Sequence, residues 1–553
     1  MNNSFLEQRT EEIAEVQHEF HALLVPVTAY LGLAFVALGI QAALESAKVT
    51  SLPSSGTTAL LGLLFGVLLQ AFDGWNIEAA MPFTFSYTVF SALLLPIIIF
   101  SGAIELRQKL FWRYLHRIVA HALIGTALST VIVAAGIVGL SRAGAIEYYS
   151  IPEAAALGAL LSATDPVAVL SAYSTVGIGA SRLYALSFGE STLNDATAIL
   201  IFRVASTMAS ARGSETHTER LATSLTLDFF VFGVGSIAYG IAVGALFSYM
   251  VKRMSFLAYG HIYLAMHLIV GIGTYMSADL LNMSGIIATL FAGLVIKQYA
   301  FFNFHTEQDR SLSLHSVEMM AHIADTAVFI SLGVSLSTQR VFDGWLVLAA
   351  FILPAIGRAA QVSLITALAN RWSGHAPVSV KEQTAMVHGG TRGAVSFSLV
   401  LTLPGSSALA VETAISAVLL VLTLSIFTNG GTTTLVLRTL GLLPKAHEHD
   451  GQDKDATVEG DAEDCTVCAS LHSMHEISPD EVLAGRFDRM LRPYLTTWSY
   501  SDDYLHRGRT SETHPLPPPR DGTPPSEGTE LDALAGGRGG ERRSRKRRRR
   551  LKV

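Results

Sequence analysis

Three polar side chains interrupt an otherwise apolar and small-residue segment, FGESTLNDATAILIF, at residues 188–202. Glu190, Asn194 and Asp195 all carry oxygen atoms, and oxygen ligands are those that hard cations prefer in proteins. A carboxylate is also a proton acceptor, and burial in apolar surroundings makes carboxyl groups in general easier to protonate. The segment therefore suggests a site at which one carboxylate holds either a small cation or a proton.

Asp195 is the residue for which this competition has the clearest consequence. We favour a carrier of cations or protons over a purely structural ion pair, because a charge at membrane depth is costly unless it has a function. A carboxylate that binds a cation releases its proton. The flux of cations and the flux of protons are then coupled in opposite directions, provided that the empty, charged site moves only slowly between the two sides of the membrane. Because position 194 is a neutral Asn, the pattern predicts one-for-one exchange with no net charge moved.

The elements that position these residues are predicted to be membrane-spanning helices. Half of the 553 residues are hydrophobic and only 15% are charged, which is typical of a polytopic membrane protein. A window of about 20 apolar residues is needed for one span. It finds thirteen candidates: roughly 21–43, 57–72, 86–105, 117–140, 152–172, 182–208, 225–251, 260–280, 283–297, 315–338, 342–369, 383–404 and 409–440. We therefore expect an all-α polytopic membrane protein, with a bend or an early end near Asn429 in the last span.

Two of these spans contain helix breakers in their middles. The fifth reads LGALLSATDPVAVL, with Pro166 after Thr164 and Asp165, and the twelfth reads MVHGGTRGAVSF, with three glycines around Arg392. Proline removes a helical hydrogen bond and clustered glycines favour unwinding. The two spans are seven apart, as expected for inverted repeats with a binding site between broken helices. We expect Thr164, Asp165 and main-chain carbonyls freed at the break to join Asn194 and Asp195 in a cation or proton site.

The remaining ionisable residues at span depth are predicted to have other roles. Glu190 is expected to pair with Arg358 or Arg392, and an arginine that faces broken-helix ends can also cap free carbonyls. Asp325 is left open as a pairing partner or as a residue near an access funnel. Ser191 lies one turn before Asp195 on the same polar stripe, and its role is also open.

The chain divides into three regions by composition. Residues 1–20 form an N-terminal extramembrane segment, 21–440 the transmembrane domain, and 441–553 a polar tail that we expect to be a largely disordered regulatory region. Loops on the tail's side carry most of the loop Lys and Arg residues, including Arg107, Lys109 and Arg113, which places the tail in the cytosol. The plasma membrane and an organellar membrane both remain open as the location.

Three patterns in the tail suggest partners. The basic run Arg542–Lys552 is expected to bind anionic lipids, and no nucleic-acid partner is expected for a polytopic chain. The stretch PLPPPR, Pro515–Arg520, fits a polyproline ligand of an SH3-type domain. A third pattern offers four zinc-type ligands, although ordinary cytosolic thiols are the favoured interpretation of its two cysteines; its members are Cys465, Cys468, His472 and His475.

Six motifs in register resemble the eukaryotic sodium/proton exchangers of the monovalent cation/proton antiporter superfamily. They are LLLPIIIFSGAIELRQKLFWR (93–113), SATDPVAVL (162–170), FGESTLNDA (188–196), MSGIIATLFAGLVI (283–296), ADTAVFISLGVSL (324–336) and GGTRGAVSFSL (389–399). The resemblance implies a core domain with two discontinuous crossing helices, a dimerisation domain and a homodimer. It implies exchange of Na⁺, or of K⁺ or Li⁺ in some members, for H⁺, which regulates pH and cation content. The family's Asn-Asp pair corresponds to Asn194 and Asp195, its unwound-helix aspartate to Asp165, and a frequent Glu to Asp325.

Two other classes of function are compatible with parts of the pattern. A cation channel, or a transport-inactive sensor of pH or cations, could use the same scaffold, but a channel would favour a continuous polar pore. An intramembrane enzyme could use Asp165 and Asp195 as a catalytic pair, but no nucleophile or metal-ligand pattern accompanies them. We therefore expect a secondary active transporter, with no enzymatic activity and no cofactor besides the transported ions.

Overall fold

A computed structural model describes most of the region predicted to span the membrane. The described residues are 28–44, 46–47, 52–71, 90–106, 108–165, 169–170, 172–173, 176–179, 181–210, 231–253, 260–303, 307–372, 377–443 and 491. The lipid-binding, polyproline and zinc-type patterns of the tail lie outside these residues.

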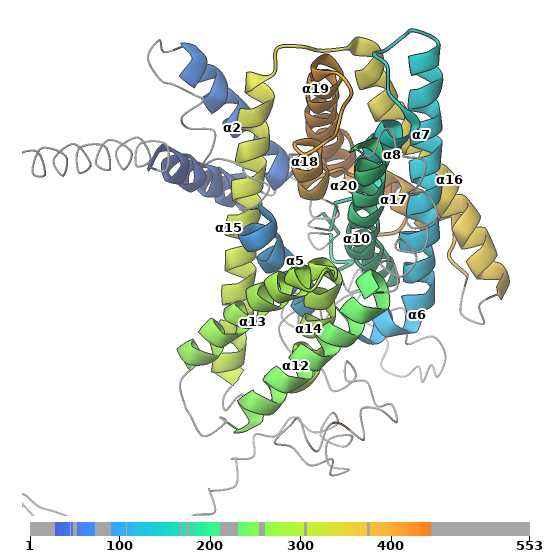
Figure 1. The fold of residues 1–553 in the computed structure, drawn as a ribbon. Coiled ribbons are helices and arrows are strands. Elements are labelled where there is room, and N and C mark those ends of the chain that lie inside the picture. Colours follow the sequence, from blue (N-terminus) through green and yellow to red (C-terminus); the bar gives the residue numbers. More distant parts are fainter. Residues whose placement is uncertain are drawn as a thin grey trace, which may run out of the picture. The chain divides into compact units, whose positions relative to one another are not determined.

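The described part of the chain is helical throughout, with no strand, which confirms the predicted all-α class. An apolar helix, Thr28–Leu44, precedes the labelled elements of Figure 1. The following elements are α2 (Ser54–Ala71), η1 (Phe90–Leu94), α5 (Leu95–Glu105), α6 (Gln108–Ala120), η2 (His121–Gly125), α7 (Thr126–Arg142), α8 (Ile151–Ser162), α10 (Arg182–Ser210), η4 (Val231–Gly235), α12 (Ser236–Arg253), α13 (Gly260–Leu280), α14 (Gly285–Tyr299), η5 (Ala300–Asn303), α15 (Glu307–Thr338), α16 (Gly344–Trp372), α17 (Val380–His388), α18 (Ala394–Val400), α19 (Ala408–Ser425), η6 (Ile426–Gly430) and α20 (Gly431–Leu440).

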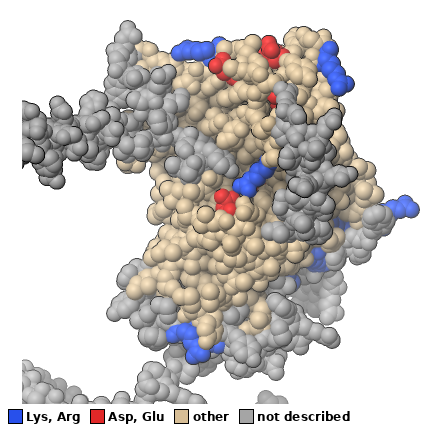
Figure 2. Space-filling view, in the orientation of Figure 1, with Lys and Arg blue, Asp and Glu red and all other residues tan. Residues whose placement is uncertain are grey.

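Several of these helices have the length and composition of membrane spans. Among the described residues, six helical segments are long and apolar enough to cross a bilayer, and four shorter apolar helices accompany them. Figure 2 shows a broad surface with few charged side chains: some lie toward the upper and lower ends of the view, others at its right edge, and an acidic and a basic group lie side by side near its middle. These features fit a protein embedded in lipid, whereas the count of thirteen spans stays a prediction.

The last predicted span does not end at Asn429, and only the type of helix changes there. A π-helical turn, η6, covers Ile426–Gly430, and the helix continues as α20 to Leu440. The helix stops at Gly441, which has the left-handed conformation with φ of 66° that is common just after a helix end. The glycine pair thus loosens the local hydrogen-bond pattern without breaking the helix.

The helices pack in two groups, which meet where α10 contacts α14 and where α15 contacts α18 and α19. One group contains α2, α5, α12, α13, α14 and α15, and the other contains α6, α7, α8, α10 and α16–α20. Small residues bring α12 and α14 together, because a Cβ atom on Gly240 would lie 2.2 Å from the carbonyl oxygen of Ala288. Since α10 contacts α6, α7, α8, α14, α17 and α18, its polar residues lie at the centre of this packing.

Candidate functional site

The fifth and twelfth predicted spans are both interrupted. The glycine breakers of the twelfth span lie in its interruption, whereas Pro166, the predicted breaker of the fifth, lies outside the described residues. Helix α8 ends at Ser162, and helices α17 and α18 are separated by residues 389–393. The two interruptions meet, because the backbone N–H of Asp165 donates to the carbonyl of Thr391 at 2.9 Å. The hydroxyl of Thr391 donates back to the carbonyl of Asp165. Non-helical backbone at this depth is therefore paired with protein groups, as membrane burial requires.

Gly393 permits the close approach of these segments. A Cβ atom at this position would lie 1.7 Å from Asp165 Oδ2 and 2.2 Å from Asp165 Cβ. The same carboxylate oxygen accepts a hydrogen bond from the backbone N–H of Ala394, at 3.3 Å. One glycine of the twelfth span thus makes room for the aspartate of the fifth.

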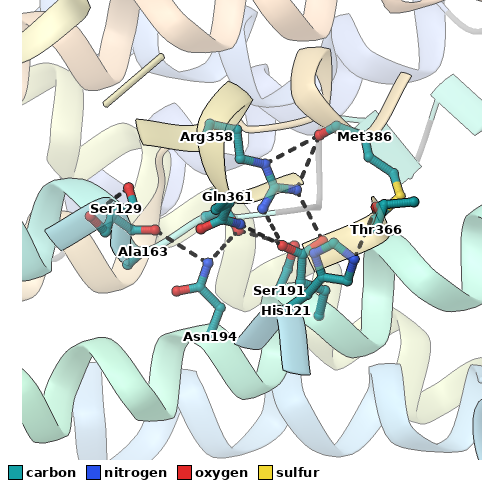
Figure 3. Close-up of polar contacts among 12 residues, drawn as sticks. His121, Ser129, Ala163, Ser191, Asn194, Arg358, Gln361, Thr366 and Met386 are labelled. Atoms are coloured by element: carbon teal, nitrogen blue, oxygen red, sulfur yellow. Dashed lines mark hydrogen bonds and ion pairs between the residues drawn. The ribbon is translucent and has the colours of Figure 1, made fainter. Parts of the chain in front are cut away.

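Asn194 ties helix α10 to the interrupted fifth span. Its Nδ2 donates to the carbonyl of Ser162 at 3.2 Å and to Thr164 Oγ1 at 3.0 Å (Figure 3). Thr164 in turn donates to Ser191 Oγ at 3.3 Å. Asn194 is fully buried, and its Oδ1 atom has no hydrogen-bond partner among the described residues. An acceptor oxygen therefore remains available next to the break.

Asp195 follows Asn194 and is partly exposed. No hydrogen bond or ion pair joins its carboxylate to another described residue, although it lies within electrostatic range of Asp165 and Arg392. The structure thus brings together the five residues of the predicted site and its neighbourhood: Asp195, Asn194, Asp165, Thr164 and Ser191. Their oxygens are of the type that binds a hard monovalent cation, and their roles stay predictions.

Glu190 is held by a buried cluster in which Arg358 is the charged partner. Arg358 forms a two-pronged ion pair with Glu190, with 3.1 Å between Nη2 and Oε2. Gln361 Nε2 donates to Glu190 Oε1 at 2.9 Å, and Arg358 also donates to the carbonyl of Met386 at 3.1–3.2 Å. We call these four residues the Glu190 clamp. The clamp joins α10, α16 and the last turn of α17 (Figure 3).

Arg392, the other candidate partner of Glu190, instead contacts main-chain carbonyls. Its Nη1 donates to the carbonyl of Ala163 at 2.9 Å and its Nη2 to that of Pro354 at 3.3 Å. The Ala163 carbonyl lies in the interruption that follows α8, so the guanidinium caps an oxygen that has left the helix. The two arginines therefore occupy different positions at the crossing.

Asp325 lies on α15, partly buried, within electrostatic range of Asp165 and Glu105. Asp325 therefore lies near the candidate site.

Arg203, another ionisable residue at predicted span depth, forms an ion pair with Asp279 at 3.1 Å, with about half of each side chain exposed. The Arg203–Asp279 contact is an exposed link between α10 and α13.

Several contributors were not singled out from the sequence. Gln361 and the Met386 carbonyl complete the Glu190 clamp, and Ser162 accepts from Asn194. Gln361 lies one helical turn after Arg358. This spacing was the sequence signal that could have indicated its place beside Glu190. Within the described ranges, no group of three or more His, Cys, Asp and Glu residues is arranged to hold a metal ion.

The described residues thus contain six helical segments long and apolar enough to cross a membrane, and two interrupted spans meet at Asp165 and Thr391. The family model for the sodium/hydrogen exchanger transmembrane region matches residues 32–439, and the chain belongs to the sodium/hydrogen exchanger family. Its membership and its apolar helices make it an integral membrane protein, and the family consists of transporters rather than enzymes.

Three comparisons show how far the likeness extends. Sodium/hydrogen exchanger 5 of Arabidopsis thaliana is 31% identical over 406 residues, which cover 70% of this chain and 74% of that protein. An uncharacterized Na⁺/H⁺ antiporter of Schizosaccharomyces pombe is 30% identical over 408 residues, covering 72% and 70%. The structure of the sodium proton antiporter MjNhaP1 from Methanocaldococcus jannaschii at pH 8 matches with a TM-score of 0.57 and 18% identity. That match covers 76% of this chain and all of MjNhaP1.

Proposed function

We propose that this protein exchanges Na⁺ for H⁺ across a membrane, one for one, with Asp195 as the residue that binds either ion. The observation that carries the proposal is the Asp195 carboxylate, which has no hydrogen-bond or ion-pair partner among the described residues. It lies on α10 beside an unfilled acceptor oxygen of Asn194. Family membership and the names of the relatives support Na⁺ and H⁺ as the transported ions.

The surrounding oxygens explain how a cation would be held. Asp195 supplies the charge, and Asn194 Oδ1 and Thr164 Oγ1 supply neutral oxygen ligands near the interrupted backbone. Hard cations suit such a set, and a monovalent ion needs only one carboxylate for neutrality. K⁺ and Li⁺ are alternative cargoes for the same oxygens.

Charge balance supports an exchange without net charge movement. Glu190 is neutralised by Arg358 in the Glu190 clamp, and position 194 is an uncharged amide. Asp195 is then the carboxylate on this stretch of α10 that binds Na⁺ and H⁺ in turn. If it carries one Na⁺ in one direction and one H⁺ in the other, each half-cycle moves the same charge.

The access step is proposed to follow the alternating-access principle. The site lies where two interrupted helices meet, and such crossings serve as the fixed point about which one bundle moves against another. We propose further that the protein acts as a homodimer and regulates pH and cation content.

The tail is proposed to lie in the cytosol and to bring further partners. The run Arg542–Lys552 would attract anionic headgroups at about 1 kcal/mol for each charge near the surface. Pro515–Arg520 would serve as a polyproline ligand for an SH3-type domain. Binding of a tail peptide to a panel of such domains tests the second proposal, and absence of binding would remove it.

A flux experiment with several cations tests the exchange proposal. Purified protein in liposomes that contain a pH-sensitive dye is given an outward proton gradient, and Na⁺, K⁺ or Li⁺ is then added outside. We expect Na⁺ to alkalinise the lumen at a rate that does not change when the membrane voltage is clamped with valinomycin and K⁺. A cation-dependent current without proton movement would replace exchange by a channel function. If the folded protein shows neither proton movement nor current with any of the three ions, a transport-inactive sensor is favoured.

A further inference from the structure

Two short connections carry the chain from the helix group of α2, α5, α14 and α15 to the group of α10. Helix α5 ends at Glu105 and α6 begins at Gln108, and α15 ends at Thr338 before α16 begins at Gly344. In the predicted order of spans, these are the third-to-fourth and the tenth-to-eleventh connections. They are seven apart and therefore equivalent in the inverted repeats. Movement of one group against the other must bend the chain at these two crossings, because hinges are a few residues at the ends of elements.

The α5–α6 crossing is fastened to α14 by two hydrogen bonds in opposite directions. Lys297 Nζ on α14 donates to the carbonyl of Leu106 at 2.9 Å. Gln108 Nε2 donates back to the carbonyl of Leu294, which lies one turn before Lys297 on α14. Lys297 and Gln108 are buried, with 8% and 3% of their surface exposed. We call this arrangement the α14 clasp.

The α15–α16 crossing is fastened to α2 in the same way. Gln70 Nε2 on α2 donates to the carbonyl of Ser337 at 2.8 Å, and Arg340 in the crossing donates back to Gln70 Oε1. We call this arrangement the α2 clasp. Helices α2 and α14 correspond to the second and the ninth predicted spans, which are again seven apart. The two clasps are therefore equivalent in the two repeats, and inversion would place them on opposite sides of the membrane.

A glycine brings the paired helices together at each clasp. Helix α14 packs on α5 and α2 packs on α15 (Figure 1). A Cβ atom on Gly293 would lie 2.7 Å from the Cβ atom of Ala103 on α5, and a Cβ atom on Gly66 would lie 2.1 Å from Ser337 Oγ on α15. Each glycine precedes the clasping residue of its own helix by four positions. The same spacing at two equivalent places indicates one device that occurs in both repeats.

We propose that the two clasps are the fixed ends of two equivalent hinges, about which the group that contains α10 moves during ion exchange. The end of α5 is held on α14 and the end of α15 on α2, so bending is confined to the few residues of each crossing. The side chains of the clasps are positioning residues, because they act on the hinges rather than on the ion. The inference rests on the exchange function proposed above, since it describes the movement which that function requires.

Loss of a clasp should change the maximal rate of exchange and not the affinity for Na⁺. A released crossing adopts additional conformations, and only the fraction in the competent one leads to productive movement. The affinity is set at Asp195 and its neighbours, so the KM for Na⁺ stays constant. A contact that forms in only one orientation of the protein would behave differently. Its loss would shift the equilibrium between the orientations and change the KM.

Hydrogen–deuterium exchange of the purified protein tests the clasps without transport. In Gln108→Met, peptides that cover the α5–α6 crossing should take up deuterium about threefold faster or more, because the local structure opens more often. In Gln70→Met, the same should hold for peptides that cover the α15–α16 crossing. Each variant should leave the other crossing unchanged. Lys297→Met should resemble Gln108→Met, and Lys297→Arg, which keeps a donor for Leu106, should resemble the wild type.

Na⁺-driven proton movement in proteoliposomes, measured over a range of Na⁺ concentrations, tests the hinge role. Gln108→Met and Gln70→Met should each lower the maximal rate about threefold to tenfold, the range covered by one hydrogen bond, with the KM within about twofold of the wild type. The double variant should lower the rate by roughly the product, because distant sites act independently. Gln41→Met is the matched control, since Gln41 donates to Thr58 on α2 at 2.8 Å, away from both crossings, and it should behave as wild type.

Three results would overturn the assignment. Deuterium uptake as slow as in the wild type would show that the clasps do not hold the crossings. Faster uptake at the wild-type maximal rate would remove the hinge role, and a changed KM at that rate would assign the contacts to one orientation. If the wild type moves no protons with Na⁺, the proposed function fails, while deuterium uptake still decides whether the clasps hold the crossings. Thermal unfolding shows that each variant is folded, and Lys297→Met replaces Gln108→Met if the latter is not.

Discussion

Removing Arg358 alone should destabilise the protein more than removing both members of its ion pair. The Glu190 side chain is almost fully buried, and Arg358 supplies two of the hydrogen bonds to its carboxylate. In Arg358→Met, Gln361 remains as a donor, but the carboxylate loses its counter-charge. An uncompensated buried charge of this kind costs about 3–5 kcal/mol, whereas replacing both charges is often close to neutral.

The expected magnitude can be converted to a melting temperature. For about 400 folded residues, the average unfolding entropy corresponds to roughly 1.2 °C for each kcal/mol. Arg358→Met should therefore lower the Tm by about 4–6 °C, and the double variant Glu190→Gln with Arg358→Met should recover most of that loss. Thermal unfolding of purified protein in one detergent, followed by tryptophan fluorescence, measures both.

An exposed ion pair provides the matched control for this experiment. Arg203 and Asp279 form an ion pair of 3.1 Å with about half of each side chain exposed, and such pairs contribute about 0–1 kcal/mol. Arg203→Met should therefore shift the Tm by about 1 °C or less. If Arg358→Met shifts the Tm no more than Arg203→Met does, or if the double variant is less stable than Arg358→Met, the argument that Glu190 is a structural anchor is wrong.

Three other perturbations test separate parts of the account. Gly393→Ala should abolish ion exchange, because its Cβ would overlap the Asp165 carboxylate, whereas Gly139→Ala, with nothing within 4 Å of the added atom, should transport normally in the same flux assay. Asn194→Asp adds a second carboxylate and should make the exchange rate respond to an imposed membrane voltage; a rate that ignores voltage, as in the wild type, would contradict the charge count. Deleting residues 542–553 should weaken sedimentation of the tail with anionic vesicles, and undiminished binding would assign lipid attraction to another segment.

The interruptions of the two crossing spans could be predicted because their cause is local. Pro166 cannot donate a helical hydrogen bond, and Gly389, Gly390 and Gly393 favour unwinding in the twelfth span. Their separation by seven spans then indicated that they are equivalent positions of two repeats. Asn429 was a weaker signal, since the helix continues through this position as a π-helical turn.

The partner of Glu190 could not be predicted because it depends on packing between helices distant in sequence. Arg358 and Arg392 were both plausible by residue type, and only the positions of α16 and α17 assign Glu190 to Arg358. The same packing places Arg392 at the carbonyl of Ala163. The contact of Gln361 with Glu190 could not be predicted, because a single amide side chain on a helix is compatible with many environments.

The close approach of Gly393 to Asp165 also could not be predicted from the sequence. From the sequence, Gly393 is one of three helix breakers in the twelfth span. The structure shows in addition that its lack of a side chain leaves space for the Asp165 carboxylate. Asp325 stayed open for a related reason, since its position relative to Asp165 depends on how α15 packs against the other helices. Residue type suggested which groups could bind ions, and tertiary contacts decided which of them meet.

Proton movement driven by Na⁺ in proteoliposomes that contain Asp195→Asn tests the central claim most directly. Asp279→Asn, which changes an exposed carboxylate on α13, is the control for the loss of one acidic group. We predict that Asp195→Asn folds with an unchanged Tm and moves no protons when Na⁺ is added, whereas Asp279→Asn and the wild type do move protons. Na⁺-dependent proton movement by Asp195→Asn at the wild-type rate would show that another group carries the ions.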